Sequence, residues 1–107
     1  MSNPIINVLV HKVWYDENDK YHREDGPAYE SSDVNVWYIH GKRHREDGPA
    51  YESSDVNVWY IHGKRHRVDG PAVEWINGDK CWCYRGDEIN CNSQQEFERL
   101  IKLKAFW

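Results

Sequence analysis

The sequence contains the same 22 residues twice in succession. HREDGPAYESSDVNVWYIHGKR occupies residues 22–43 and returns without change at residues 44–65. A partial third copy, HRVDGPAVE, follows at residues 66–74, and VWYDENDKY at residues 13–21 aligns with the end of the unit. Self-similarity at a fixed period is typical of arrays in which each unit packs on its neighbours, so the repeat constrains the fold strongly.

Each unit has the residue pattern of a β-hairpin. Residues 36–40 are rich in β-branched and aromatic side chains, and the His-Gly pair at 40–41 is typical of a two-residue turn with positive φ. The Asp-Gly-Pro motif at 47–49 breaks the chain, because proline cannot donate to a strand ladder, and a second strand follows at 50–53. The sequence predicts a mainly β protein: an antiparallel β-hairpin repeat array, a meander with a 22-residue period.

The first and last units of the array each have a side with no neighbouring unit, and the sequence predicts a different terminal segment to pack at each end. We expect one domain over residues 1–107, with an N-terminal strand region at 4–15 and repeat units at about 13–90. Ser93-Gln94-Gln95-Glu96 is a capping-box pattern, followed by apolar residues on one helical face. This pattern predicts one C-terminal α-helix cap over about residues 94–104.

Composition narrows the class of protein. Apolar residues make up 39% of the chain, but six Trp and seven Tyr predict a thin, aromatic core. A net charge of -4 argues against nucleic acid as a partner, since phosphate binding needs positive charge. No segment approaches the length of a membrane helix and the N-terminus does not resemble a signal peptide, so we expect no membrane association and a cytosolic location.

Three arginines are each followed two residues later by an aspartate. We expect these pairs to fix the Gly-Pro turns structurally; they are Arg23 with Asp25, Arg45 with Asp47 and Arg67 with Asp69. The alternative is that the repeated basic clusters form a cationic stripe that meets phosphates or an acidic protein surface. Arg43 and Arg65 have no such aspartate and are better candidates for binding.

Aromatic residues and histidines recur at the same period. Strand alternation places Trp37 and Ile39 on one face and Val36, Tyr38 and His40 on the other. We expect the repeated tryptophans to form core, whereas the tyrosine hydroxyls suit surface anchors. The predicted binding residues are therefore Tyr38, Arg43, His44, Tyr60, Arg65 and His66.

Metal binding and catalysis have weaker support. The histidine rows have no closely spaced ligands, and we expect a hydrogen-bonding role for them. Cys81, Cys83 and Cys91 make a zinc site conceivable, but the first two occupy the positions of Val36 and Tyr38 and most simply replace apolar side chains. Identical units present like groups in rows, whereas an active site needs unlike groups at one point, so we expect no enzyme activity, metal or cofactor.

The HRxDGPA motif, the Gly-Lys turns and the ending NSQQEFERLIKLKAFW resemble a family of small repeat proteins of T4-like tailed bacteriophages, and more distantly MORN-like hairpin repeats. The resemblance covers about residues 12–107. It implies a phage protein in the host bacterial cytoplasm that binds a bacterial host protein and inhibits a defence system. The chain departs from the pattern at 81–90, where the basic GKRHR becomes GDEIN.

Three functions remain open from the sequence. The first is a non-enzymatic binder of a bacterial host protein, in which aromatic anchors supply affinity and basic residues assist association. The second is a sponge for a nucleotide-like signalling molecule, held by the Lys-Arg turns and an aromatic ring. The third is a structural or adhesin-like virion component. Unpaired edge strands also leave a homodimer open.

Overall fold

The computed structural model describes residues 11–104. Within this range it contains short strands and one helix. The strands are β1 (Lys12–Val13), β2 (Tyr29–Glu30), β3 (Val34–Val36), β4 (Tyr38–Ile39), β5 (Lys42–Arg43), β6 (Tyr51–Ser53), β7 (Val56–Val58), β8 (Tyr60–Ile61), β9 (Lys64–Arg65), β10 (Val73–Trp75), β11 (Lys80–Tyr84) and β12 (Asp87–Ile89). The helix is α1 (Gln94–Lys104).

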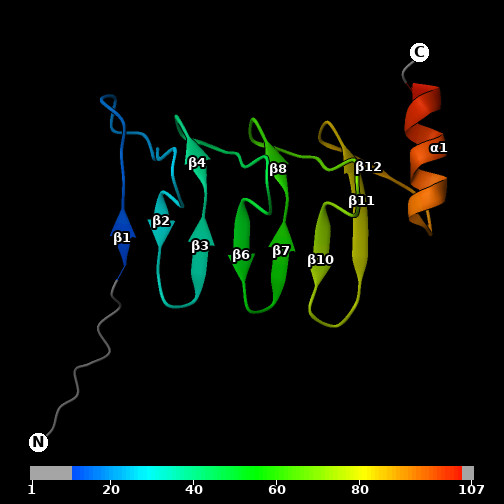
Figure 1. The fold of residues 1–107 in the computed structure, drawn as a ribbon, viewed down its shortest axis with the longest axis horizontal. Helices are drawn as coiled ribbons and strands as arrows, with labels where there is room; N and C mark the ends of the chain where they lie inside the picture. Colours follow the sequence, from blue (N-terminus) through cyan, green and yellow to red (C-terminus); the bar gives the residue numbers. More distant parts are fainter. Residues whose placement is uncertain (1–10, 105–107) are drawn as a thin grey trace, which may run out of the picture.

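The strands form a single-layer antiparallel array. Eight of them make one sheet in the order β1-β2-β3-β6-β7-β10-β11-β12, and the pairs β4-β5 and β8-β9 form small hairpins at its upper edge. Figure 1 shows the units side by side, with α1 beyond β12 at one end. The molecule measures only 17 Å along its shortest axis. The predicted hairpin repeat array with a C-terminal helix is therefore confirmed.

The predicted strand at 36–40 is interrupted at Trp37, which is a correction to the expected continuous strand. The backbone nitrogen of Trp37 donates to the oxygen of Ala50 at 2.7 Å, whereas its oxygen accepts from the nitrogen of His44 at 3.1 Å. The chain therefore changes partner at this residue, from β6 of the next unit to the hairpin of its own unit. In the divergent last unit, β11 runs without interruption through Trp82.

On one side of the sheet, large and small residues alternate from one strand to the next. Val36 pairs with Tyr51, and Tyr51 pairs in turn with Val58, so Ala50 lies between Trp37 and Trp59 on adjacent strands. Ala28, Ala50 and Ala72 are fully buried. We call the side that carries this row the tryptophan face; its members are Trp14, Ala28, Trp37, Ala50, Trp59, Ala72 and Trp82. The opposite side, the tyrosine face, carries Tyr29, Val36, Tyr38, Tyr51, Val58 and Tyr60.

The hairpin tips have the expected turn geometry and contact one another. His40 and Gly41 have φ values of 47° and 83°, as a two-residue turn of this twist requires. The nitrogen of Gly41 donates to the oxygen of Tyr21 at 2.7 Å, and the stem of Lys20 lies 3.3 Å from where a Cβ on Gly41 would be. Each tip therefore rests on the tip before it, and the positive φ at this position favours glycine.

The ends of the array match the sequence only in part. Residues 4–10 of the predicted first strand lie outside the described residues, and β1 begins at Lys12. Helix α1 starts as predicted, because the Ser93 hydroxyl accepts from the nitrogen of Glu96 at 3.1 Å, and Glu96 accepts from the nitrogen of Asn92. Phe97 is fully buried at this end. Among the described residues, no helix has the length and apolar character needed to cross a bilayer.

Candidate functional site

The arginine of each HRxDGPA motif lies over a tryptophan ring. The guanidinium carbon of Arg45 is 3.8 Å from the ring centroid of Trp37. Its Nε donates to Asp47 at 3.0 Å, and its Nη1 donates to the oxygen of Pro49 at 3.0 Å and to Glu52 at 3.2 Å. A stacked guanidinium with both its carboxylate partners in place holds the Gly-Pro turn against the tryptophan face.

The same cluster recurs in the neighbouring units. Arg23 stacks on Trp14 at 3.8 Å and Arg67 stacks on Trp59 at 3.9 Å. The predicted Arg-Asp pairs are all present, with nitrogen–oxygen distances of 2.9 to 3.0 Å. A Cβ on Gly26, Gly48 or Gly70 would lie 2.6 to 2.9 Å from the arginine Cζ, so the glycine of the motif makes room for the guanidinium.

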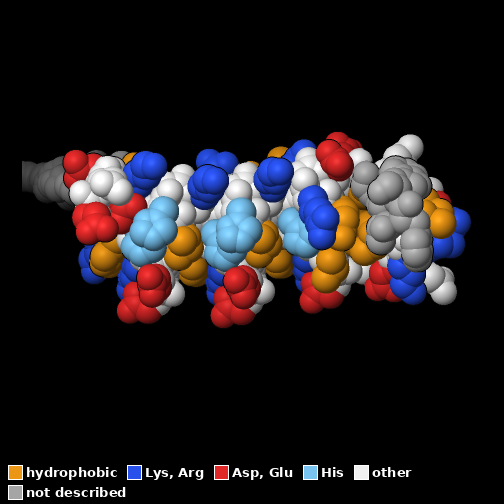
Figure 2. Space-filling model, turned by 90° about the horizontal axis from the view of Figure 1, so that it is seen from above, with side chains coloured by type: hydrophobic (Ala, Val, Ile, Leu, Met, Phe, Trp, Pro, Cys, Tyr) orange, Lys and Arg blue, Asp and Glu red, His pale blue; other side chains and the backbone are white. Residues whose placement is uncertain are grey.

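These contacts favour the expected structural role of the three arginines over the alternative of a cationic stripe. Each side chain is only 21–23% exposed and is neutralised by two carboxylates. The outer surface is instead acidic, since the side chains of Glu24, Asp25, Glu46 and Asp47 are 82–88% exposed. Seen from the tip side, rows of lysine and arginine, histidine, and acidic side chains run along the array (Figure 2).

The tryptophans line open grooves, which corrects their expected place in the core. Trp37 and Trp59 are half-buried, and the buried residues beside them are the small alanines. The physical reason is that the described strands form a single-layer sheet, so no other sheet packs on the tryptophan face to cover the large indole rings. The partner that shields each indole is the arginine stacked on it.

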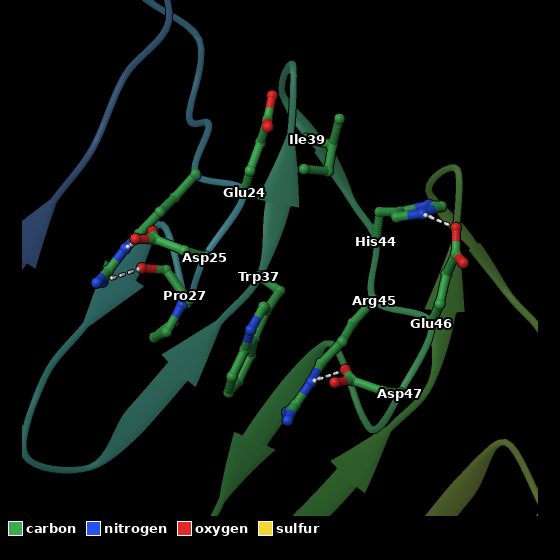
Figure 3. A pocket seen from close by; sticks show the side chains of 11 residues that line it. Glu24, Asp25, Pro27, Trp37, Ile39, His44, Arg45, Glu46 and Asp47 are labelled. Carbon is green, nitrogen blue, oxygen red and sulfur yellow. Dashed lines mark hydrogen bonds and ion pairs between the residues drawn. The ribbon is translucent and has the colours of Figure 1, made fainter.

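Two equivalent grooves cross the tryptophan face. The first, of about 770 Å³, lies between the turn with Asp25 and Pro27 and the turn with Arg45 and Asp47, with Trp37 between them (Figure 3). The second, of about 570 Å³, repeats it one unit later around Trp59. The first is lined by Arg23, Glu24, Asp25, Gly26, Pro27, Trp37, Ile39, His44, Arg45, Glu46 and Asp47.

In the last unit, helix α1 lies where the two units before it have an open groove. The indole Nε1 of Trp82 donates to Oε1 of Gln94 at 2.8 Å, and Nε2 of Gln94 donates to the backbone oxygen of Val68 at 2.9 Å. Val68 occupies the motif position that Glu24 and Glu46 hold in the earlier units. One carboxamide therefore bridges a tryptophan and the turn of the preceding motif.

The predicted binding residues His44 and His66 connect one tip to the next. His44 lies at the edge of the first groove, and its Nδ1 accepts from the backbone nitrogen of His62 at 2.9 Å. His66 accepts in the same way from Arg85 at 2.9 Å. Their role in the fold is the hydrogen-bonding one that the sequence predicts.

Tyr38, Arg43, Tyr60 and Arg65 lie on the other face, so the six predicted residues do not form one site. Arg43 pairs across the hairpin with Tyr38 and donates to the hydroxyl of Tyr60 at 3.3 Å. Its guanidinium carbon also lies 5.3 Å from the Tyr60 ring centroid. These residues form a row on the tyrosine face in which arginine and tyrosine alternate along the tips.

Arg65 borders a separate basic hollow. Tyr60, Lys64, Arg65 and Arg85 line this shallow space of about 400 Å³, together with the nearby Asp87. Three cationic side chains beside a tyrosine ring form a surface on which a phosphate and an aromatic base could be held.

The cysteines occupy buried or partly buried positions, as apolar side chains do. Cys83 is fully buried, and burial raises the pKa of its thiol to about 12. Burial also raises the pKa of Cys81 and of Cys91. Over residues 11–104, no group of three or more His, Cys, Asp or Glu side chains is placed to hold a metal ion.

Sequence reasoning missed two sets of residues. Glu30, Glu52 and Glu74 complete the arginine clusters, and their recurrence seven residues after each arginine was a signal for them. Gln94 had no such signal, because its contact with Trp82 depends on how α1 folds back on the array.

Three comparisons with known proteins found no match: no family model, no curated protein and no solved structure matches this chain.

Proposed function

We propose that the chain is a non-enzymatic repeat module that binds a bacterial host protein through the grooves of its tryptophan face. The observation that carries this proposal is the recurrence of one groove at a shift of 22 residues, with the same residue types at its walls except that Val68 takes the place of Glu46. Repeated recognition elements on a rigid array suit a partner protein that contacts several units at once, because several weak contacts then act together.

The chemistry of the grooves favours a protein partner. Each offers a half-buried tryptophan, which is a frequent anchor residue in protein interfaces. The exposed acidic side chains at the rim, such as Glu24 and Glu46, repel phosphate and attract basic side chains. The arginines that could bind an anion are already engaged by aspartate and glutamate.

The test is capture from a bacterial lysate with charge-reversed variants. Glu24→Lys combined with Glu46→Lys changes the rim while leaving the arginine clusters intact. Glu17→Lys combined with Asp33→Lys makes the same change in net charge at exposed positions that do not line either groove. We expect the wild type and the control to retain one protein specifically, and the rim variant to retain at least tenfold less. Equal retention by all three would contradict the proposal.

A second candidate function is supported by the hollow around Lys64, Arg65 and Arg85. Its cations and the ring of Tyr60 suit a nucleotide-like ligand. Native mass spectrometry of the protein purified from bacteria distinguishes the two candidates. A retained nucleotide that is lost in Arg65→Ala, together with the absence of a captured protein, would favour the second.

A further inference from the structure

The last unit shows what can occupy a position that is open in the two units before it. Gln94 bridges the indole N–H of Trp82 and the backbone oxygen of Val68. We call this pair of groups, a tryptophan Nε1 and the oxygen of the residue that follows the motif arginine, the amide notch. The equivalent notch of the first groove is formed by Trp37 and Glu24, and that of the second by Trp59 and Glu46.

The polar groups of these two notches have no protein partner among the described residues. Neither the Nε1 of Trp37 nor that of Trp59 makes a hydrogen bond there, whereas the Nε1 of Trp82 does. The stacked arginine covers the ring face of each indole and does not accept from its N–H. Trp37 and Glu24 line the first groove together, as Trp59 and Glu46 line the second. An indole donor and a backbone acceptor on the walls of one groove match a primary carboxamide, which has one acceptor oxygen and a donor NH₂ group.

We infer that the two open notches bind the glutamine side chain in the first turn of a helix of the partner protein. The inference rests on the proposed function and specifies its partner: the glutamine oxygen accepts from Trp37 or Trp59, and its NH₂ group donates to the oxygen of Glu24 or Glu46. This is the contact that α1 makes within the chain, repeated with an external helix.

Charge supports a helical, basic partner for the open notches. Where α1 binds, the residue that follows the motif arginine is Val68; at the open notches it is glutamate. Glu24 and Glu46 are 82% exposed, and Asp25 and Asp47 lie beside them. The N-terminal end of a helix carries partial positive charge, which these carboxylates stabilise, and lysine or arginine in the partner adds to the attraction.

The probe is the peptide acetyl-NSQQEFERLIKLK-amide, which has the sequence of residues 92–104. It is added to the full-length, ¹⁵N-labelled protein, and the indole N–H resonances of the tryptophans are followed by NMR. We expect the resonances of Trp37 and Trp59 to shift with peptide concentration. A peptide with alanine in place of the residue equivalent to Gln94 loses both hydrogen bonds of the carboxamide and should bind about five- to a hundredfold more weakly.

Variants of the protein provide the second measurement. Trp37→Phe and Trp59→Phe keep a ring under the arginine but remove the N–H donor, and unfolding midpoints show whether each remains folded. Each removes one of the two hydrogen bonds and should weaken binding of the wild-type peptide at its own groove by about three- to tenfold, less than the alanine peptide. Backbone amide resonances of the groove residues report this binding, because the variant has lost the indole N–H. Trp75→Phe is the matched control, because Trp75 is 49% exposed and lies outside both grooves.

The outcomes separate this inference from the proposed function. Three results would contradict glutamine binding at the two open notches: a shift confined to Trp82, no shift up to the solubility limit of the peptide, or equal binding of both peptides. If a host protein is still captured through the acidic rim, the proposed function stands without it. If the peptide binds as expected but no host protein is captured, the notch stands and the proposed function fails.

Discussion

His44 accepts a hydrogen bond from the backbone of His62, the turn residue at the equivalent of position 40 in the next unit. The nitrogen–nitrogen distance is 2.9 Å, and the two imidazole rings lie 4.6 Å apart. His22 and His40 repeat the relationship at 3.0 Å and 4.1 Å. Because Nδ1 of His44 is the acceptor, it carries no proton, and Nε2 faces Glu46. Each hairpin tip is therefore held to the next by an uncharged imidazole.

We predict that acid weakens the array through His66, which accepts in the same way from the backbone nitrogen of Arg85. Burial, and then the charge of Arg85, lower the pKa of His66 below 6.5 in the folded protein. A lowered folded pKa means that stability is complete above the unfolded value near 6.5 and declines as the pH falls through the folded value. Urea unfolding at pH 8, 7, 6 and 5 should show a decreasing free energy of unfolding below pH 6.5.

The variant His66→Gln tests this assignment, since glutamine offers an acceptor that does not titrate. Its stability should decline less steeply below pH 6.5 than that of the wild type. Asp16 does not confuse the result: its hydrogen bond with His40 lowers its pKa to about 2, so its contribution is lost only at much lower pH. An unchanged slope in His66→Gln would contradict the role of His66.

We predict that Gly48→Ala destabilises the protein by displacing Arg45. A Cβ at this glycine would lie 2.9 Å from Cζ of Arg45, so the guanidinium must shift from its position on Trp37 and strain its hydrogen bonds. We expect a loss of about 1 to 3 kcal/mol, from charge-assisted hydrogen bonds to partly exposed carboxylates and a cation–π contact. Chemical denaturation measures it.

A double-mutant cycle with Arg45→Ala gives the control for this prediction. Without the guanidinium there is no clash, and alanine at position 48 should be neutral or stabilising by up to about 1 kcal/mol, because it restricts the unfolded chain. A loss of the same size in both backgrounds would show that the backbone, and not Arg45, requires the glycine.

We predict that deletion of residues 44–65 leaves a folded, shorter protein. The segment contains β6, β7, β8 and β9, and the sequence that follows it continues the repeat at the same phase. Unfolding should remain cooperative, with a denaturant m-value lower by about a fifth, since 22 of 107 residues are removed. A circular dichroism spectrum of an unfolded chain would contradict the modular organisation.

We predict that Cys83 resists alkylation in the native protein. Its thiol is fully buried and its pKa is raised to about 12, whereas Cys81 and Cys91 are partly exposed. Iodoacetamide at pH 8 should modify Cys81 and Cys91 slowly, and Cys83 only after denaturant is added. Peptide mass spectrometry measures the order, and modification of Cys83 at the rate of Cys91 would exclude the buried position.

The repeat predicted much of the fold because its signals are local. The positive-φ turn at Gly41, the Arg45–Asp47 pair and the start of α1 at Ser93 each depend on residues that are neighbours in sequence. Alternation also placed Trp37 and Ile39 together, as the lining of the first groove shows. These features need no knowledge of how one unit meets the next.

The relations between units could not be predicted in the same way. The break at Trp37 and the contact between His44 and His62 depend on the offset between adjacent hairpins. The tryptophans were expected in a core because a repeated indole usually packs between two layers. A sequence of alternating faces does not say how many layers of sheet there are, and residues 11–104 form a single one.

The identical pair of units also fixes a distance. The second copy contributes β6 and β7 to the main sheet, and adjacent strands are separated by roughly 4.8 Å, so one unit adds about 10 Å to its width. Gain or loss of a unit would move α1 relative to β1 by that increment while preserving the contacts at both ends. The sheet therefore sets the spacing between binding positions, and each 22-residue unit changes the total length by the same increment.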